Sequence, residues 1–230
     1  MITLSLESSA TTASAALDIN GEIFEEFINN GLTHSTTLMP LVEKLLNEKG
    51  IKPKDIDLFA VAKGPGSFTG IRIGIATVKG LAMGTGKKVA GVSTLEAMAA
   101  MHISCGYKVC ALMDARLGQY YNAVFDCTEG IIRLTEDRAL SGEEIAAEIT
   151  KDNKPVLLMG DGANKFAKDF EGNFILPEGD AVYQRAKGVA ILARSAEKLS
   201  AEMLLPEYLR IPQAERELKN KQNNERNVKL

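Results

Sequence analysis

The chain begins with three apolar-rich segments of strand length, at residues 2–8, 14–19 and 22–28. Their length and composition predict β-strands. Asn20 and Gly21 separate the second and third segments, and both residue types tolerate the positive φ angles of a tight hairpin turn. A helix is predicted over residues 36–49, where apolar positions recur with helical spacing until Gly50 ends the pattern. The chain is therefore predicted to open with an antiparallel meander followed by a helix.

In the next part of the chain, short apolar strands alternate with helices. Strands are predicted at 57–62 and 88–92, with helices from the loop 64–70 to about 83 and at 94–101. Part of this order then recurs, with strands at 109–113, 121–125, 131–134 and 156–159 and helices at 142–149 and 186–200. We therefore predict an α/β fold of two similar subdomains, 1–104 and 105–212, with mixed sheets flanked by helices. The polar residues 213–230 are predicted to form a tail.

A glycine-rich loop joins a predicted buried strand to the helix that follows it. Its glycines and small polar residues are Gly64, Gly66, Ser67, Thr69 and Gly70. Glycine permits positive φ and close approach of the backbone to a ligand, and a helix N-terminus favours an anionic group. The loop has neither the dinucleotide fingerprint nor the Lys-Ser/Thr pair of a Walker A loop. The spacing leaves two interpretations open, a phosphate-binding loop and a tight turn without a ligand.

The helix after this loop is apolar on two sides. One face is suited to covering the sheet and consists of Ile71, Ile75, Val78 and Ala82. A second stripe consists of Ile73, Ala76, Gly80 and Met83. The preceding helix has a similarly broad apolar arc, which includes Leu38, Leu41, Val42 and Leu45. We predict that the second stripe and this arc form half of a helix bundle that another chain completes. The alternative is that the second half of this chain covers both helices.

Composition and charge exclude several classes of function. The 230 residues are 45 % hydrophobic and 25 % charged, as in ordinary globular proteins. The net charge of −3 lacks the basic surplus of a chain that binds nucleic acid by itself. No stretch reaches the roughly 20 apolar residues that cross a membrane, and no signal peptide is visible at the start, so a cytoplasmic protein without membrane contact is expected. The three cysteines, Cys105, Cys110 and Cys127, have no CxxC spacing and fit a reducing compartment.

Few side chains are candidates for catalysis. His34 and His102 are far apart and lack the further ligands that a metal site requires, so no metal site is predicted. Asp114 follows a predicted buried strand, and Asp161 lies between two glycines. Such carboxylates hold magnesium or activate water in some proteins, and more often they cap turns and helices. No catalytic residue is predicted.

Several segments resemble those of one protein family. The sequence Gly-Pro-Gly-Ser-Phe-Thr-Gly-Ile-Arg-Ile-Gly at residues 64–74 resembles the signature of the TsaB (YeaZ) family. Residues 4–9, 34–35, 113–116 and 205–210 also match that family in place. The resemblance extends over nearly the whole chain, to about Lys219.

This resemblance implies a fold and a role. The fold is that of the actin/Hsp70/sugar-kinase superfamily, with two α/β subdomains. The implied role is a non-catalytic subunit that supports the paralogous catalytic subunit, TsaD, and joins a small ATPase, TsaE. TsaD transfers a threonylcarbamoyl group to the adenosine next to the anticodon of tRNA. Family members contact TsaD, or form homodimers, through the first two helices. The chain is then expected to reach tRNA only through the complex.

The resemblance also implies which chemistry is present. Thr94 and Met98 stand where TsaD has two metal-binding histidines, and a hydroxyl and a thioether are poor substitutes for imidazoles. No cofactor of its own is expected, while ATP or ADP with magnesium is expected at the complex interface. Glu7 and Asp114 are the candidate nucleotide or magnesium residues. Glu7 stands where family members often have aspartate, which leaves nucleotide binding there open.

An alternative function is an independent nucleotide-hydrolysing or phosphotransferase enzyme on the same fold. Its phosphate site would be the glycine loop, with Glu7 or Asp114 near magnesium. A metal-dependent peptidase is disfavoured because the pair of histidines is missing.

Overall fold

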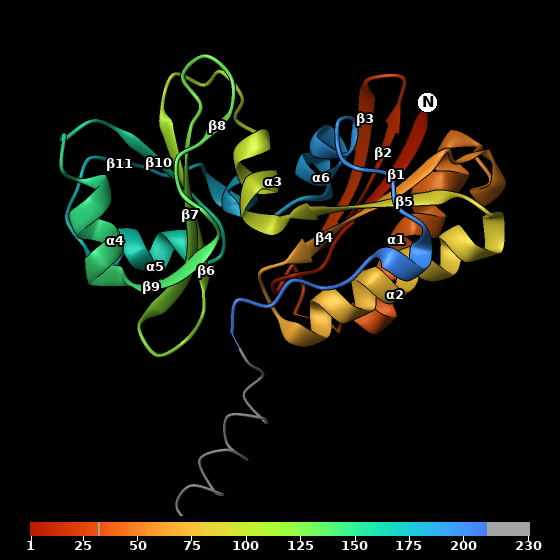
Figure 1. Ribbon diagram of the computed structural model, residues 1–230, viewed down its shortest axis with the longest axis horizontal. Helices are drawn as coiled ribbons and strands as arrows, with labels where there is room; N and C mark the ends of the chain where they lie inside the picture. Colours follow the sequence, from red (N-terminus) through yellow and green to blue (C-terminus); the bar gives the residue numbers. More distant parts are fainter. Residues whose placement is uncertain (32, 211–230) are drawn as a thin grey trace, which may run out of the picture.

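The computed structural model describes residues 1–31 and 33–210, which form two β-sheets flanked by helices (Figure 1). The first sheet has the strand order β3-β2-β1-β4-β5. Its strands are β1 (Ile2–Glu7), β2 (Ala13–Ile19), β3 (Glu22–Ile28), β4 (Leu58–Gly64) and β5 (Lys88–Ser93). The three N-terminal strands pair antiparallel, while β4 runs parallel to both β1 and β5. The predicted α/β class with mixed sheets is confirmed.

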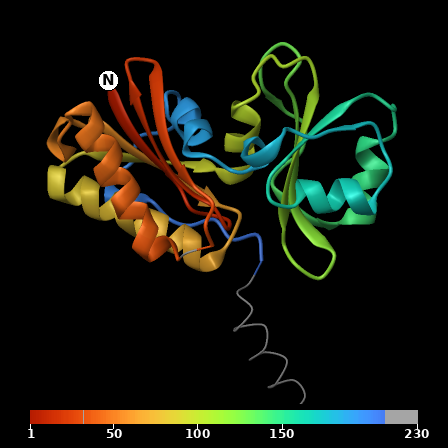
Figure 2. The same ribbon diagram turned by 180° about the vertical axis from the view of Figure 1, so that it is seen from behind.

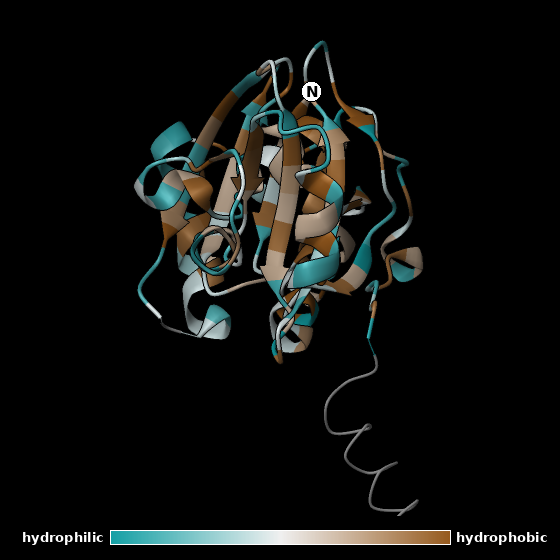
Figure 3. Ribbon diagram, turned by 90° about the vertical axis from the view of Figure 1, so that its left-hand side faces the viewer, coloured by the Kyte–Doolittle hydropathy of each residue, from teal (hydrophilic) through white to brown (hydrophobic). Residues whose placement is uncertain are grey.

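The second sheet has the order β11-β10-β6-β7-β8, and β9 pairs with β7 beside β8. Its strands are β6 (Lys108–Asp114), β7 (Gln119–Asp126), β8 (Ile132–Arg133), β9 (Arg138–Ser141), β10 (Val156–Met159) and β11 (Phe174–Ile175). Helices α4 (Gly142–Ile149) and α5 (Ala163–Asp169) cover one face, and α3 (Thr94–Ala100) packs on the other. The central strands are mostly hydrophobic, as their cover on both faces requires (Figure 3).

Local sequence explains the boundaries of the first elements. Asn20 and Gly21 both have positive φ, as a tight hairpin between β2 and β3 requires. The next helix, α1 (His34–Lys49), ends at Gly50, which is left-handed with φ 64°. Ser67 begins α2 (Phe68–Thr85), and its side chain accepts a hydrogen bond from the amide of Gly70. The predicted meander, turn and helices are confirmed at these positions.

The end of the chain does not follow the predicted subdomain boundary. Helix α6 (Ala186–Ala193) lies on the first sheet, on the face opposite α1 and α2 (Figures 1 and 2). Val189 and Ala193 of this helix pack with Leu58 and Ala60 of β4. The expected subdomain 105–212 is therefore corrected, because residues 186–210 pack with the first sheet. We call that sheet with its helices and residues 186–210 the N-terminal lobe, and residues 108–182 the C-terminal lobe.

Some predicted elements differ in extent. The helix predicted over 186–200 ends at Ala193, and the chain then pairs Leu199 with Val89 of β5. Helix α5 and the short strands β9 and β11 were not predicted. The predicted tail, 213–230, lies outside the described residues. Among the described helices, none is long and apolar enough to cross a membrane.

Candidate functional site

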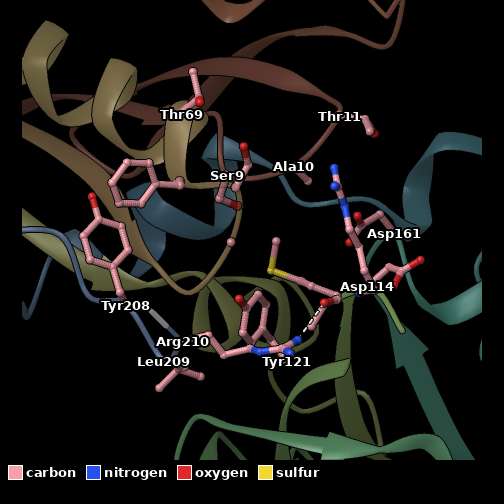
Figure 4. Close-up of a pocket in the computed structure, with 16 residues that line it drawn as sticks. Ser9, Ala10, Thr11, Thr69, Asp114, Tyr121, Asp161, Tyr208, Leu209 and Arg210 are labelled. Carbon is pink, nitrogen blue, oxygen red and sulfur yellow. Dashed lines mark hydrogen bonds between the residues drawn. The ribbon is translucent and has the colours of Figure 1, made fainter. Parts of the chain in front are cut away.

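A cleft of about 590 Å³ lies between the two lobes (Figure 4). The N-terminal lobe contributes the turn after β1, the start of α2 and the segment near residue 209, and the C-terminal lobe contributes the turn after β6 and Asp161. Its lining residues are Ser9, Ala10, Thr11, Gly66, Ser67, Phe68, Thr69, Met113, Asp114, Ala115, Arg116, Tyr121, Asp161, Tyr208, Leu209 and Arg210. The ends of β1, β4 and β6 all point toward this cleft, which is where ligands bind in many α/β folds.

The glycine loop is packed tightly against the end of β1. The amide of Ser67 donates to the carbonyl oxygen of Ser9 (2.6 Å), and a Cβ at Gly66 would lie 2.5 Å from that same oxygen. A Cβ at Gly70 would overlap the carbonyl oxygen of Ser8, whose hydroxyl donates to the Gly70 carbonyl (2.9 Å). These glycines therefore serve close backbone contact within the chain. The amide of Ser67 is already engaged and is not directed at a ligand.

The five predicted loop residues do not all reach the cleft. Gly66, Ser67 and Thr69 line it. Gly70 is buried against Ser8, and Gly64 is buried beneath the backbone of Glu207. The structure thus separates the predicted phosphate-binding set into three residues that a ligand can touch and two glycines that only permit packing.

Glu7 ends β1 and lies beneath the loop, outside the lining of the cleft. Its side chain is buried, with Oε1 accepting a hydrogen bond from the amide of Ser9 (2.6 Å). Oε2 has no hydrogen-bond partner among the described residues. Burial, together with the nearby carboxylate of Asp161, raises the pKa of Glu7 to about 7. Glu7 is therefore buried away from the space in which a bound magnesium ion would meet its ligands.

Two carboxylates of the C-terminal lobe do line the cleft. Asp114, at the exposed end of β6, accepts a hydrogen bond from the amide of Arg116 (2.7 Å) and lies 3.6 Å from the ammonium of Lys165. Asp161 accepts a hydrogen bond from the side chain of Gln184 (2.8 Å), and burial raises the pKa of its carboxyl. Of the predicted pair Glu7 and Asp114, the structure therefore brings Asp114 to the cleft, and Asp161 joins it.

Cationic and aromatic side chains complete the cleft. Arg116 and Arg210 line it, and in the described part of the chain neither forms an ion pair with a carboxylate. Two arginines without carboxylate partners suit an anionic group such as a nucleotide phosphate. Tyr121 and Tyr208 line the same space. The predicted site residues did not include these four. Arg116 stood out beside Asp114 at the end of a predicted strand, and the segment 205–210 through the family resemblance.

Thr94 and Met98 are the residues that the resemblance sets opposite two histidines of TsaD. Thr94 and Met98 are both buried, and the described residues contain no cluster of three histidine, cysteine or acidic side chains that would hold a metal ion. His34 bonds the carbonyl oxygen of Ala10 through Nε2 (2.6 Å). His102 lies in the turn after α3, where burial lowers the pKa of its ring. The two histidines therefore lie apart, with neither in the cleft.

The predicted partner residues of α1 are buried within this chain. Leu38, Leu41, Val42 and Leu45 pack against the first sheet in the core of the N-terminal lobe. The expectation that another chain covers this arc is wrong, because the strands of the same lobe cover it. The alternative, cover by the second half of the chain, is wrong for the same reason. A broad apolar arc fits a helix lying flat on a twisted sheet.

The second stripe of α2 faces outward. Ala76, Gly80 and Met83 are exposed, and Ile73 is half-buried. The Met83 side chain is 66 % exposed, and a Cβ at Gly80 would have no atom within 4 Å. An apolar, small-residue stripe on the surface of a long helix is suited to close approach by another helix.

Known proteins resemble this chain over most of its length. A sequence model of the family TsaD, tRNA N6-adenosine threonylcarbamoyltransferase, matches residues 29–217. The tRNA threonylcarbamoyladenosine biosynthesis protein TsaB of Bacillus subtilis (strain 168) is 30 % identical over 224 residues, which covers 94 % of this chain and 96 % of that protein. The protein of the same name from Escherichia coli (strain K12) is 36 % identical over 148 residues, covering 63 % of this chain and 64 % of that protein.

A solved structure shares the fold. YeaZ from Pseudomonas aeruginosa superimposes with a TM-score of 0.78 at 27 % identity, covering 90 % of this chain and 99 % of that one. The match includes both lobes and thereby the cleft between them. Sequence similarity over nearly the full length and this common fold agree with each other and with the signature at residues 64–74. The chain belongs to the TsaB (YeaZ) family.

Proposed function

We propose that the chain is a non-catalytic subunit that acts with a TsaD-type catalytic subunit and a TsaE-type ATPase in the cytoplasm. The reaction it supports is threonylcarbamoyl transfer to the adenosine next to the anticodon of tRNA. The names of its relatives indicate this pathway. The observation that carries the subunit role is the outward-facing stripe of α2, formed by Ile73, Ala76, Gly80 and Met83.

The stripe favours a helical partner. Ala76 and Gly80 leave room for a second helix at an axis separation of about 8 Å, the close end of helix packing. Met83 adds an exposed, adaptable apolar side chain that would be buried on association. In the absence of TsaD, we expect the same stripe to pair with itself in a homodimer, since a two-fold axis brings identical surfaces together.

We further propose that the chain binds no cofactor tightly by itself. ATP or ADP would be held at the complex interface, with Arg116 and the free nitrogens of Arg210 directed at phosphate. Ser67 and Thr69 supply hydroxyl groups in the same space. Magnesium fits these residues poorly, because Glu7 is buried with a raised pKa and Asp114 is close to Lys165. tRNA would be contacted through the complex, consistent with the net charge of −3.

The test compares two substitutions at Gly80. Gly80→Ala adds a methyl group where no atom lies within 4 Å and is expected to keep partner binding within about threefold. Gly80→Leu is expected to weaken binding to a TsaD-type chain by about 100-fold or more, because a bulky side chain holds the two helices apart. Glu171→Leu puts the same side chain on an exposed site of the C-terminal lobe and serves as the control.

Affinity is measured by titration calorimetry, and melting temperatures verify that each variant is folded. Threonylcarbamoyl transfer to tRNA is then assayed with TsaD, TsaE and an enzyme that makes the threonylcarbamoyl-adenylate donor, with and without this chain. Normal binding by folded Gly80→Leu would exclude the stripe as the interface. Transfer that runs equally well without the chain would exclude the subunit role.

A second candidate function is an independent nucleotide-hydrolysing or phosphotransferase enzyme. The observation in its favour is the cleft, where Asp114 and Asp161 lie opposite Ser67 and Thr69. This function requires steady ATP turnover by the isolated chain that is lost in Asp114→Ala. A turnover rate that Asp114→Ala leaves unchanged would point to a contaminating enzyme and exclude this candidate.

A further inference from the structure

The last described residues, Glu207–Arg210, run along the edge of the cleft, and we call them the strap. After the short 3-10 helix Ala201–Met203, the chain turns back across the N-terminal lobe toward the C-terminal lobe (Figure 1). The amide of Glu207 donates to the carbonyl oxygen of Lys63 (2.8 Å) at the end of β4. No Cβ fits at Gly64, because the Glu207 carbonyl lies against it. The strap is therefore anchored to backbone beside the glycine loop.

The middle of the strap is held by α2. The Tyr208 ring lies 4.8 Å from that of Phe68, centre to centre, and its hydroxyl accepts a hydrogen bond from Nε of Arg72 (2.9 Å). The Arg72 guanidinium also lies 3.8 Å from the centre of the Phe68 ring. Arg72 and Phe68 belong to the first turns of α2, directly before the outward stripe begins at Ile73. Tyr208 is thus in direct contact with the start of the helix that we propose as the partner surface.

The far end of the strap reaches the other lobe. Arg210 donates from a terminal nitrogen to the carbonyl oxygen of Ala115 (2.8 Å), in the turn between β6 and β7 (Figure 4). In that turn Arg116 and Leu117 have positive φ angles of 64° and 55°, which non-glycine residues rarely adopt. Leu209, between the two anchors, lines the cleft. These four consecutive residues therefore bond β4 through Glu207, α2 through Tyr208, and the opposite wall of the cleft through Arg210.

We propose that the strap couples closure of the cleft to the partner surface of α2. Arg210 holds the C-terminal lobe close while Tyr208 fixes the start of α2, so the angle between the lobes and the position of α2 change together. The inference rests on the proposed function, in which a TsaD-type chain docks on α2. A partner that prefers one position of α2 then stabilises one degree of closure, and closure in turn raises affinity for the partner. Linkage requires the two effects to be equal.

The first experiment measures closure of the cleft in the absence of a TsaD-type chain. Spin labels are attached to cysteines introduced at Asn47 and Glu171, exposed sites on opposite lobes, in the full chain with Cys105→Ser. The labelled chain is diluted with an excess of unlabelled chain, so that pulsed dipolar spectroscopy gives the distribution of distances between the two labels of one chain. The chain with the wild-type strap is expected to give one narrow distribution of label distances. Arg210→Ala is expected to broaden it and shift its mean, since the bond to Ala115 is lost.

A matched control lies in the same strap. The Glu207 side chain is 56 % exposed and forms an ion pair with Lys63 (2.9 Å). Glu207→Gln removes this ion pair and keeps the backbone hydrogen bond to Lys63. Exposed ion pairs contribute little, so its distance distribution is expected to match the wild type. An unchanged distribution in Arg210→Ala would overturn the proposal, as would an equal change in Glu207→Gln.

The second experiment measures affinity for a TsaD-type chain. The titration is done without nucleotide, so that the proposed contact of Arg210 with phosphate plays no part. Arg210 is not part of the α2 stripe, so a loss of affinity in Arg210→Ala then reports coupling. We expect a loss of about fivefold or more, within the usual range for linked sites, and less than twofold in Glu207→Gln. Arg210→Lys retains a donor and is expected to recover part of the affinity.

The two experiments separate two kinds of failure. If Arg210→Ala opens the cleft and TsaD affinity stays unchanged, the coupling is refuted. If the chain with its wild-type strap does not bind TsaD, the proposed function fails and the coupling fails with it. In that case the distances between the spin labels still show whether the strap holds the two lobes together.

Discussion

The buried carboxyl of Glu7 makes a strong prediction about stability and pH. Glu7→Gln removes the ionisable group and keeps an oxygen that accepts the hydrogen bond from the Ser9 amide. The position vacated by Oε2 has no hydrogen-bond partner among the described residues, so the new amide group breaks no bond there. The substitution therefore isolates the charge of Glu7 from most of its packing.

The magnitude follows from the two states of the chain. In the unfolded chain Glu7 loses its proton near its ordinary pKa of 4.5, and in the folded protein near pH 7. Between these values the folded protein binds the extra proton, so stability decreases as the pH rises from 4.5 to about 7 and stays reduced above it. This difference in pKa corresponds to about 3 kcal/mol, of which about 2 kcal/mol or more lies between pH 5 and pH 8.

Urea unfolding followed by circular dichroism at pH 5, 6, 7 and 8 measures this effect. The stability of Glu7→Gln relative to the wild type is expected to increase by about 2 kcal/mol from pH 5 to pH 8. Asp161 also has a raised pKa, and its contribution is present in both proteins. Glu171→Gln, at an exposed site, serves as the control and is expected to show no such change. A difference between Glu7→Gln and wild type that is independent of pH would refute the reasoning.

Two further substitutions test the packing of each lobe. Gly70→Ala is expected to destabilise the N-terminal lobe by about 2 kcal/mol or more, because the methyl group overlaps the carbonyl oxygen of Ser8; thermal unfolding measures this, and a melting temperature equal to that of the wild type would contradict it. Phe166→Ala removes a buried ring that contacts Tyr120, Phe170 and Phe174, so a loss of about 3–5 kcal/mol is expected. Chemical denaturation measures the second loss, and a change below 1 kcal/mol would show that neighbouring rings fill the cavity.

Periodicity and turn residues predicted most of the N-terminal lobe because its signals are local. Asn20 with Gly21, and Gly50 at the end of α1, mark boundaries through backbone conformations that few residues adopt. Helix α5 escaped prediction because it has seven residues, of which two are buried. The length predicted for α6 was wrong since apolar residues continue past Ala193, where the chain pairs with β5 instead.

The candidate site could be predicted in part. The glycine spacing located Gly66, Ser67 and Thr69 at the cleft, and strand-end position located Asp114. Sequence does not show which surface covers an apolar arc, so the residues of α1 were assigned to a partner although they pack on their own sheet. Tyr121 and Tyr208 come from segments that are distant in sequence, and local patterns carry no signal of where such segments meet.

The return of residues 186–210 to the N-terminal lobe has a consequence for biosynthesis. The face of the first sheet that α6 covers, with Leu58, Ala60 and Val92, is covered only in part, by Ala97 of α3, until α6 has left the ribosome. During translation, part of the apolar surface of the earlier strands thus stays exposed to solvent while the C-terminal lobe is synthesised and folds. A nascent chain halted before Ala186 is expected to bind chaperones that hold exposed apolar segments. Emergence of α6 then acts as the step that commits the N-terminal lobe to its native state.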